Sequence, residues 1–417
     1  MFLEISEKIF AVIAVLFYSR AFADFLPETH PLSPFKEILA YTAFTITLIL
    51  IARRWKNFAY IVFKERFLWI LIVLVIASIS WSDLPLETLN QVIPLLRVTV
   101  FGTYFATRFS IKEQMYLLAW MFGAAAILSI LFAVALPQYG IVGLGFISNM
   151  EDIVHTGTWR GIYVHKTILG TMMALGLLVF LFCSTVARKG RWMMLAGAGL
   201  CFGVLLMSTT KGALAILFII LILIPFYKAL RWKLTLAIPF FSFTTLMSGI
   251  ILVLLTVNAE QALNSLGRDV TLTGRTIYWP LMLNKLWERP WLGYGYKTFW
   301  IGGWKGEPAD VWRFLAYGNE PPHAHNGFLN LWFDVGLLGL FVFIIGFTIN
   351  YIRSIVWMRS AKTAEGFVPI AYLTFLFLVN LTESFLLDPE LLWMLYVSLT
   401  LSMHCKSSTT AESVALS

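Results

Sequence analysis

Two histidines stand two positions apart in the sequence HAHN, immediately before an apolar run that starts near residue 327. A histidine at the edge of such a run can take up a proton near neutral pH, which suits a general base. A metal site is the alternative for His323 and His325, but no carboxylate-rich or Cys/His cluster accompanies them, so we expect no metal. A structural histidine that bonds the backbone also remains open. Asn326 is a residue type that caps helices.

Cationic residues stand at the ends of other apolar runs. Such charges cost desolvation unless a partner binds them, and few acidic residues lie nearby in the sequence. Together they predict a pocket for phosphate or diphosphate. Snorkelling to lipid headgroups is the alternative for Arg97 and Lys211. The residues are Arg97, Arg160, Lys166 with His165 before it, Lys211, and Arg275.

The segments that must position these residues are apolar over most of the chain. Of 417 residues, 59% are hydrophobic and 13% are charged, whereas soluble domains carry roughly 25% charged residues. Lipid is therefore the expected solvent, and continuous runs of ~20 residues predict an all-α integral membrane protein. We expect about twelve spans, with ten or eleven as alternatives. They centre on residues 8–24, 38–52, 67–81, 92–107, 115–136, 167–186, 192–208, 213–229, 234–257, 327–352, 367–385 and 388–404.

Lysine and arginine are concentrated in every second connection between these runs, as in RRWKNFAYIVFKER at 53–66. The positive-inside rule then makes both termini cytoplasmic and places the long connections 137–166 and 258–326 outside. We expect one polytopic membrane domain over residues 1–417. Residues 8–24, followed by Ala21-Phe22-Ala23, also imitate a cleavable signal peptide, and we favour an uncleaved first helix.

Several other classes of protein are excluded. The net charge of +8 comes from topology signals rather than a nucleic-acid surface, and Cys183, Cys201 and Cys405 are too scattered for a disulfide framework or a zinc site. There is no P-loop and no GxGxxG, so an ATP-driven transporter in one chain is excluded. Within the late connection, Thr276 to Glu288 has the pattern of an amphipathic helix that stops at Pro290.

Four motifs in this order resemble the O-antigen ligase and polysaccharide polymerase superfamily. They are RGxxxHK at 160–166, STTKG at 208–212, GRTxxW at 274–279, and HAHN at 323–326, which is followed by Asp334 and a GLLG turn at 336–339. The similarity spans about residues 155–345. It implies a GT-C-like arrangement in the bacterial inner membrane, with one large late periplasmic loop that contains helices.

The resemblance further implies a metal-independent, inverting glycosyltransferase that needs no cofactor. Its donor would be a glycan linked through diphosphate to undecaprenol, and its acceptor a sugar hydroxyl. By analogy Arg275 and Lys211 would hold the diphosphate, joined by Arg160, Lys166 and Arg97, while His325 would act on the acceptor. His323, Asn326 and His165 would support them. Many relatives have arginine at Lys211, and glutamate is common at Asp334.

The resemblance leaves two activities open. A polymerase would extend another lipid-linked repeat unit, whereas an O-antigen ligase would transfer the glycan to lipid A-core. His165 and Lys166 after Arg160, together with the chain's compact size, favour a polymerase, for which a chain-length regulator protein is a candidate partner. A lipid-linked oligosaccharide flippase is a third reading. It would need charged residues along a central cavity in both halves, whereas these residues cluster at the outer mouth.

Overall fold

The computed structural model describes residues 2–23, 33–145, 155–187, 189–232, 235, 275–300, 323–361 and 363–404. Within these ranges the elements are α-helices and short 3₁₀ turns, and the one strand-like pairing there is an isolated bridge between Ile141 and Trp159. Continuous apolar runs favour this outcome because a helix satisfies its own backbone hydrogen bonds in lipid. The predicted all-α class is confirmed.

Each predicted span except 234–257, which apart from residue 235 lies outside the described residues, falls on a helix. The elements are α1 (Phe2–Tyr18), α2 (Ser33–Ala52), α3 (Trp55–Val62), α4 (Arg66–Ala77), η2 (Ser78–Ser80), α5 (Pro85–Arg108), α6 (Ile111–Ala135), α7 (Pro137–Gly140), α9 (Lys166–Val186), α10 (Arg191–Met207), α11 (Lys211–Trp232), α14 (Arg275–Glu288), η4 (Thr298–Trp300), α16 (Gly327–Ser360), η5 (Ala364–Phe367), α17 (Val368–Val379) and α18 (Leu391–Ser402).

Length and composition identify membrane-crossing candidates among the described helices. Five are long and apolar enough, in α2, α6, α9, α11 and α16. Four further apolar helical segments are shorter, at Arg66–Ser80, Arg191–Met207, Ala364–Val379 and Leu391–Ser402. The protein is therefore a helical membrane protein, and the count of twelve spans stays a prediction.

Close approach between helices depends on glycine at two contacts. α5 packs on α18 at Gly102, where a β-carbon would lie 2.8 Å from the carbonyl oxygen of Met394. α9 packs on α6 at Gly176, where a β-carbon would lie 2.9 Å from the ring of Phe122. Small residues at such contacts let helix backbones pack closely in lipid, where the hydrophobic effect contributes little to helix association.

α16 is broken at Val335 and Gly336, whose backbone angles are not helical. The N–H of Leu337 donates to the carbonyl oxygen of Pro290 at 2.7 Å, so the connection after α14 is hydrogen-bonded into the broken turn. Gly336 has a φ of 69°, and a β-carbon there would lie 2.1 Å from the carbonyl oxygen of Trp291. The first glycine of the GLLG turn therefore allows the connection at 289–298 to dock against α16.

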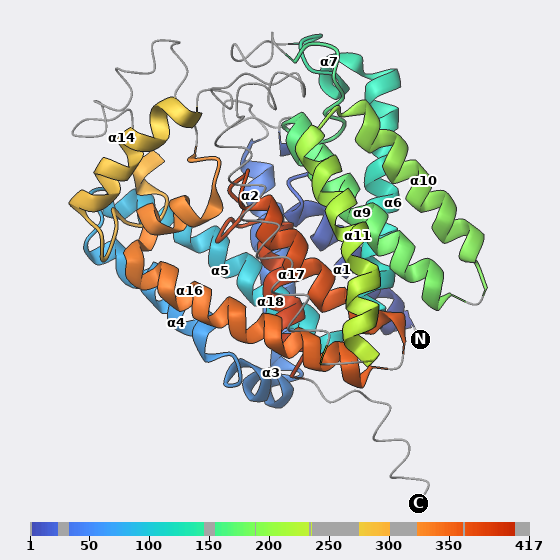
Figure 1. Cartoon of the computed structure of the whole chain (residues 1–417), viewed down its shortest axis with the longest axis horizontal. Helices are drawn as coiled ribbons and strands as arrows, with labels where there is room; N and C mark the ends of the chain where they lie inside the picture. Colours follow the sequence, from blue (N-terminus) through green and yellow to red (C-terminus); the bar gives the residue numbers. More distant parts are fainter. Residues whose placement is uncertain are drawn as a thin grey trace, which may run out of the picture.

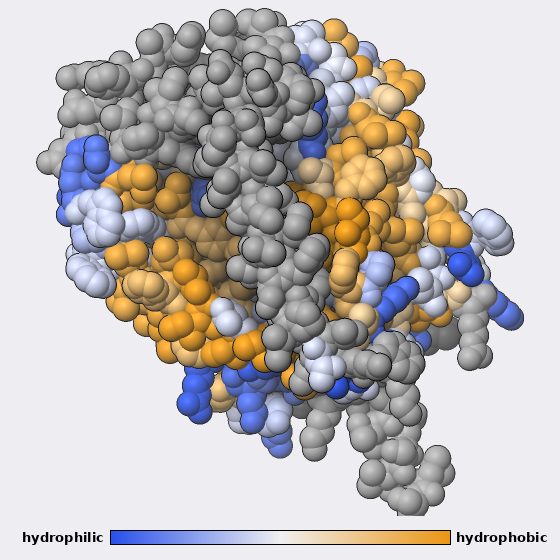
Figure 2. Space-filling model, in the orientation of Figure 1, coloured by the Kyte–Doolittle hydropathy of each residue, from blue (hydrophilic) through white to orange (hydrophobic). Residues whose placement is uncertain are grey.

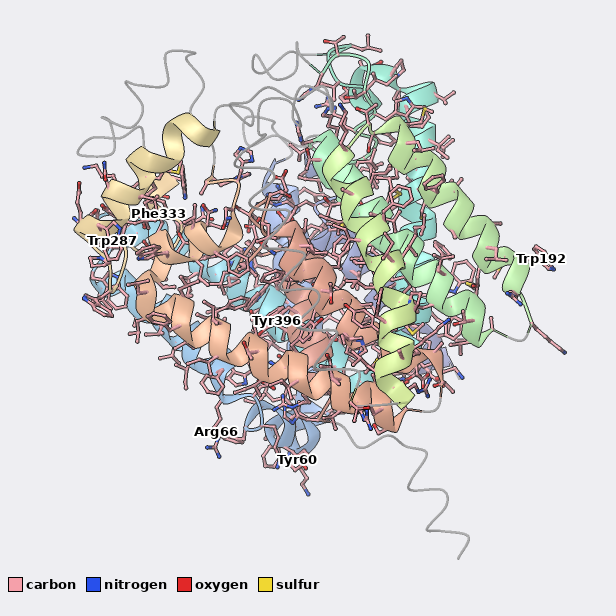
Figure 3. All side chains as sticks on the ribbon, in the orientation of Figure 1. Tyr60, Arg66, Trp192, Trp287, Phe333 and Tyr396 are labelled. Atoms are coloured by element: carbon pink, nitrogen blue, oxygen red, sulfur yellow. The ribbon has the colours of Figure 1, made fainter. Side chains whose placement is uncertain are left out.

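The two ends of the molecule differ in character. Figure 1 shows α7 and α14 at one end and α3 at the other. Figure 2 shows apolar residues over much of the visible face, with hydrophilic residues at the upper left beside α14 and at the lower end, where Figure 3 labels Tyr60 and Arg66. The described parts of the two long connections thus share one end, opposite the basic segment 53–66. Which end faces the periplasm stays a prediction.

Candidate functional site

The HAHN motif forms the turn that starts α16. The side-chain oxygen of Asn326 accepts hydrogen bonds from the N–H groups of Phe328 and Leu329 at 3.0 and 3.1 Å, which confirms the expected N-cap. His325 has a φ of 50°, in the left-handed region that β-carbons disfavour. Its N–H donates to Nδ1 of His323 at 3.2 Å, a contact that helps to hold this conformation. Strained backbone of this kind is common at functional sites.

Glu383, from the connection between α17 and α18, lies beside the two histidines. Its Oε2 is 3.6 Å from Nδ1 of His325, and the ring centroids of His323 and His325 are 4.2 Å apart. Sequence reasoning missed Glu383 because it lies far along the chain from HAHN. The available signal was a carboxylate near the end of the predicted apolar run 367–385.

Backbone contacts explain how Glu383 reaches the motif. The N–H of Gly327 donates to the carbonyl oxygen of Asn380 at 2.9 Å, and a β-carbon on Gly327 would lie 2.1 Å from Oδ1 of Asn380. That Oδ1 accepts the N–H groups of Phe385 and Leu386 at 2.8 and 3.0 Å, so one buried amide shapes the connection. A glycine immediately after Asn326 allows this connection to dock on the start of α16.

The same three side chains could in principle hold a metal ion, because their ligand atoms lie within 4.8 Å of one another. This corrects the expectation that no carboxylate accompanies the histidines. However, Nδ1 of His323 accepts the N–H of His325, so in the neutral ring the proton is on Nε2. A metal-binding histidine normally offers a lone pair at one nitrogen and donates its other N–H. The donor set therefore fits a hydrogen-bonded pair better than a metal centre.

Burial keeps His323 neutral. Desolvation and the neighbouring His325 lower the pKa of His323 to about 4, although Glu383 and Asp388 act in the opposite direction. Its neutral ring can therefore accept the His325 N–H across the physiological pH range.

Ion pairs join three chain segments next to the histidines. Lys297, from the connection after α14, pairs with Asp388, and Arg20, just after α1, pairs with Glu390 at 2.7 Å. Burial alone would raise the pKa of Asp388, but Lys297 and Arg20 hold it well below its ordinary range. The backbone N–H of Lys297 also donates to Oδ1 of Asp334 at 2.9 Å. Asp334, the acid that follows HAHN in the motif, therefore helps to hold Lys297 in place. None of these pairs could be expected from local sequence.

Two of the predicted cations, Lys166 and Lys211, are the first residues of α9 and α11. The Thr210 hydroxyl donates to the carbonyl oxygen of Lys166 at 3.0 Å, so Lys166 and Lys211 begin neighbouring helices. Nδ1 of His165 accepts the Thr167 N–H at 3.2 Å and caps α9.

Arg160 lies on the segment that leads into α9. Its Nε donates to the carbonyl oxygen of Tyr139 at 2.8 Å, which fixes this segment against α7. The N–H of Trp159 donates to the carbonyl oxygen of Met207 at 3.1 Å and connects the segment with the end of α10.

The residues after α1 connect the Arg160–Lys166 segment with the histidine turn. The N–H of Phe22 donates to the carbonyl oxygen of Ile162 at 2.7 Å, while Arg20 pairs with Glu390 in the connection that carries Glu383. The Arg160–Lys166 segment and the histidine turn are thus both anchored to the same short stretch of chain. The structure brings them to one end of the molecule, as the topology analysis expected.

Arg97 has its own contacts with α2. It is 7% exposed in α5, with Nη1 3.3 Å from Oε2 of Glu37 and Cζ 4.6 Å from the centroid of the Tyr41 ring. The expectation of few acidic neighbours was therefore wrong for Arg97, because a carboxylate from α2 reaches it. Its role toward a diphosphate stays a prediction.

Arg275 is the first residue of α14, and its side chain lies outside what the structure describes. The predicted amphipathic helix over Thr276–Glu288 is confirmed by α14. Met282 and Leu286 of this helix pack with Ala324 of HAHN and Phe333 of α16. The ring of Trp287, labelled in Figure 3, also meets the ring of Trp332 of α16, with 5.4 Å between their centroids. This small core holds α14 against the histidine turn.

Comparison with known proteins gives two matches. Residues 195–344 match the protein family described as O-antigen ligase, a stretch that contains STTKG, GRTxxW and HAHN. Over 318 residues the chain is 26% identical to the exopolysaccharide production protein ExoQ of Rhizobium meliloti (strain 1021), covering 73% of this chain and 68% of that protein. Both matches support the resemblance that the motifs indicated: this chain is similar to the O-antigen ligase family and to a protein of exopolysaccharide production.

Proposed function

We propose that this membrane protein is a glycosyltransferase that polymerises lipid-linked repeat units of O-antigen or exopolysaccharide at the periplasmic face of the inner membrane. The donor is a glycan on undecaprenyl diphosphate, and the acceptor is a sugar hydroxyl of a second lipid-linked unit. Similarity to a relative named for exopolysaccharide production favours the polymerase. Transfer to lipid A-core is the second candidate, because the matching family is described as O-antigen ligase.

One observation supports this proposal above the others. A histidine at the start of α16 faces a carboxylate. Through the residues after α1, an ion pair and a backbone hydrogen bond connect its surroundings with the segment that leads to Lys166, whose carbonyl oxygen bonds Thr210 beside Lys211. A base for the acceptor and cations for the departing diphosphate are the two requirements of glycosyl transfer from such a donor.

The proposed reaction is a single displacement. The acceptor hydroxyl gives its proton to His325 while its oxygen bonds to the anomeric carbon of the donor. The bond between that carbon and the diphosphate oxygen breaks, and the electron pair leaves with the diphosphate. Arg160, Lys166, Lys211 and Arg275 stabilise the negative charge that develops on this leaving group. One displacement inverts the anomeric centre.

These side chains also supply what a metal ion otherwise would. The base accepts the proton directly, and the cations neutralise the leaving group, so we propose that the reaction needs no metal and no nucleotide.

Product analysis tests the proposal. Purified protein in lipid nanodiscs is incubated with a diphosphate-linked repeat unit, with and without lipid A-core, and with or without a chelator. We expect a ladder of longer lipid-linked glycans that is unchanged by the chelator. Products found only on lipid A-core would establish the ligase instead, and no product with either acceptor would contradict both.

A further inference from the structure

The Nδ1 atom of His325 points to a further residue of the site. Among the side chains that the structure describes, its Nδ1 is buried and has no hydrogen-bond partner. In a neutral imidazole one nitrogen donates and the other accepts, so a base at Nε2 must carry its proton on Nδ1. Leaving a buried N–H without an acceptor costs stability, so an acceptor is expected close by.

The groups around this nitrogen narrow the choice of acceptor. His323 cannot serve, because its Nδ1 already accepts the backbone N–H of His325. Asp388 is held by Lys297, from the connection after α14. Glu383 is the carboxylate that approaches this nitrogen, with its Oε2 at 3.6 Å. This exceeds an ordinary hydrogen bond by about half an ångström, a gap that often closes when substrate binds.

The backbone fixes Glu383 in this place. Its N–H donates to the carbonyl oxygen of Val379 at 2.9 Å, which extends the last turn of α17. Asn380 then holds the rest of the connection against Gly327, at the start of the helix that His325 precedes. The carboxylate and the imidazole are therefore presented by two segments that are bonded to each other.

We propose that Glu383 is the positioning residue of the general base. Its carboxylate accepts the Nδ1–H of His325, which selects the tautomer with a lone pair on Nε2 and orients that lone pair toward the acceptor hydroxyl. When the acceptor proton moves to Nε2, the ring becomes an imidazolium, and the ionised carboxylate stabilises it. Glu383 keeps its charge and exchanges no proton. This inference rests on the proposed function, in which His325 is the base.

The test compares Glu383→Gln with Glu383→Asp and with Glu87→Gln, an exposed glutamate in the first turn of α5. Glu383→Gln should lower kcat by roughly 10- to 10³-fold. The loss should be smaller than the roughly 10⁴-fold loss known for a fully buried triad aspartate, since Glu383 is 21% exposed. KM for the donor should stay within about twofold, because the residue does not contact the diphosphate. Glu87→Gln should behave like the unmodified protein.

The pH profile separates positioning from a purely structural role. Loss of the carboxylate makes the imidazolium less stable, so in Glu383→Gln the acid limb of kcat should move to lower pH. Glu383→Asp should keep the acid limb and recover part of kcat. It also supplies the test if Glu383→Gln does not accumulate in the membrane, because unchanged kcat in Glu383→Asp would contradict positioning at this distance.

The outcomes distinguish this inference from the proposed function. If His325→Ala is inactive while Glu383→Gln keeps the rate and pH profile of the unmodified protein, the positioning role is wrong and the proposed function stands. If His325→Ala itself transfers glycan at full rate, the proposed function fails first. A fall in donor affinity and thermal stability with an unmoved acid limb would assign Glu383 a structural role only.

Discussion

At the scale of single residues, His323 links the site to pH. The pKa of His323 is about 4 in the folded protein, against about 6.5 for an unperturbed histidine, because of burial and the neighbouring His325. Between these values the unfolded chain binds more protons than the folded one, so stability rises with pH. The contribution is complete above about pH 6.5 and is lost as the pH falls through about 4.

Thermal unfolding in detergent tests this link. The unmodified protein should lose stability progressively from pH 6.5 to pH 4, while His323→Gln should show a flatter dependence over the same range. An amide can still accept the His325 N–H, so the variant should remain folded at neutral pH. Parallel curves for the two proteins would show that His323 does not titrate as described.

Local sequence revealed some site residues and could not reveal others. The cap at Asn326 follows from residue type and the start of an apolar run, and the histidine pair from its spacing. Glu383, Lys297 and Arg20 were missed because their partners lie in distant segments, and ion pairs of this kind depend on how the helices pack.

At the scale of elements, the apolar runs predicted the helices well and their interruptions poorly. A run of 327–352 reads as one continuous helix, yet α16 breaks at Val335 and Gly336. The break arises because the connection after α14 donates and accepts backbone hydrogen bonds within that turn, as between Tyr294 and Phe333 at 2.7 Å. Periodicity along one segment carries no information about a second segment that inserts into it.

This docking predicts the effect of a single methyl group. Gly336→Ala would force a β-carbon into a φ of 69° and to 2.1 Å from the carbonyl oxygen of Trp291. We expect a loss of about 1–3 kcal/mol in stability, together with reduced activity, because Lys297 is positioned by the same connection. The matched control is Gly199→Ala in α10, where a β-carbon would meet nothing within 4 Å. Equal thermal stability of the two variants would contradict the docking role of Gly336.

At the scale of the whole molecule, the described parts of the two long connections lie at one end and the basic segment 53–66 at the other (Figure 1). This arrangement agrees with the charge pattern of the sequence. Composition predicted a membrane protein because 13% charged residues cannot cover the surface of a soluble fold this long. The number of spans could not be fixed in the same way, because several apolar helices fall short of ~20 residues and tilt and local thinning change the length that a span needs.

Cysteine labelling tests the orientation. Glu288 ends α14 with a side chain 42% exposed, and Lys64 is exposed in the basic segment that follows α3. In cells with a permeable outer membrane, Glu288→Cys should react with a membrane-impermeant maleimide and Lys64→Cys should not. The native Cys183 and Cys201 are buried and should contribute little background. Labelling of the Lys64→Cys variant alone would reverse the orientation.

The central claim is that His325 takes the acceptor proton, and single-turnover transfer from a pre-bound donor tests it most directly. His325→Ala should bind the lipid-diphosphate donor normally but transfer glycan roughly 10²–10⁴-fold more slowly, the usual contribution of a general base. His325→Gln should be equally slow, because an amide cannot accept a proton at neutral pH. His404→Gln serves as the control, because His404 follows the C-terminal end of α18 and Glu383, beside His325, precedes its start. Transfer by His325→Gln at the rate of the unmodified protein would contradict the account.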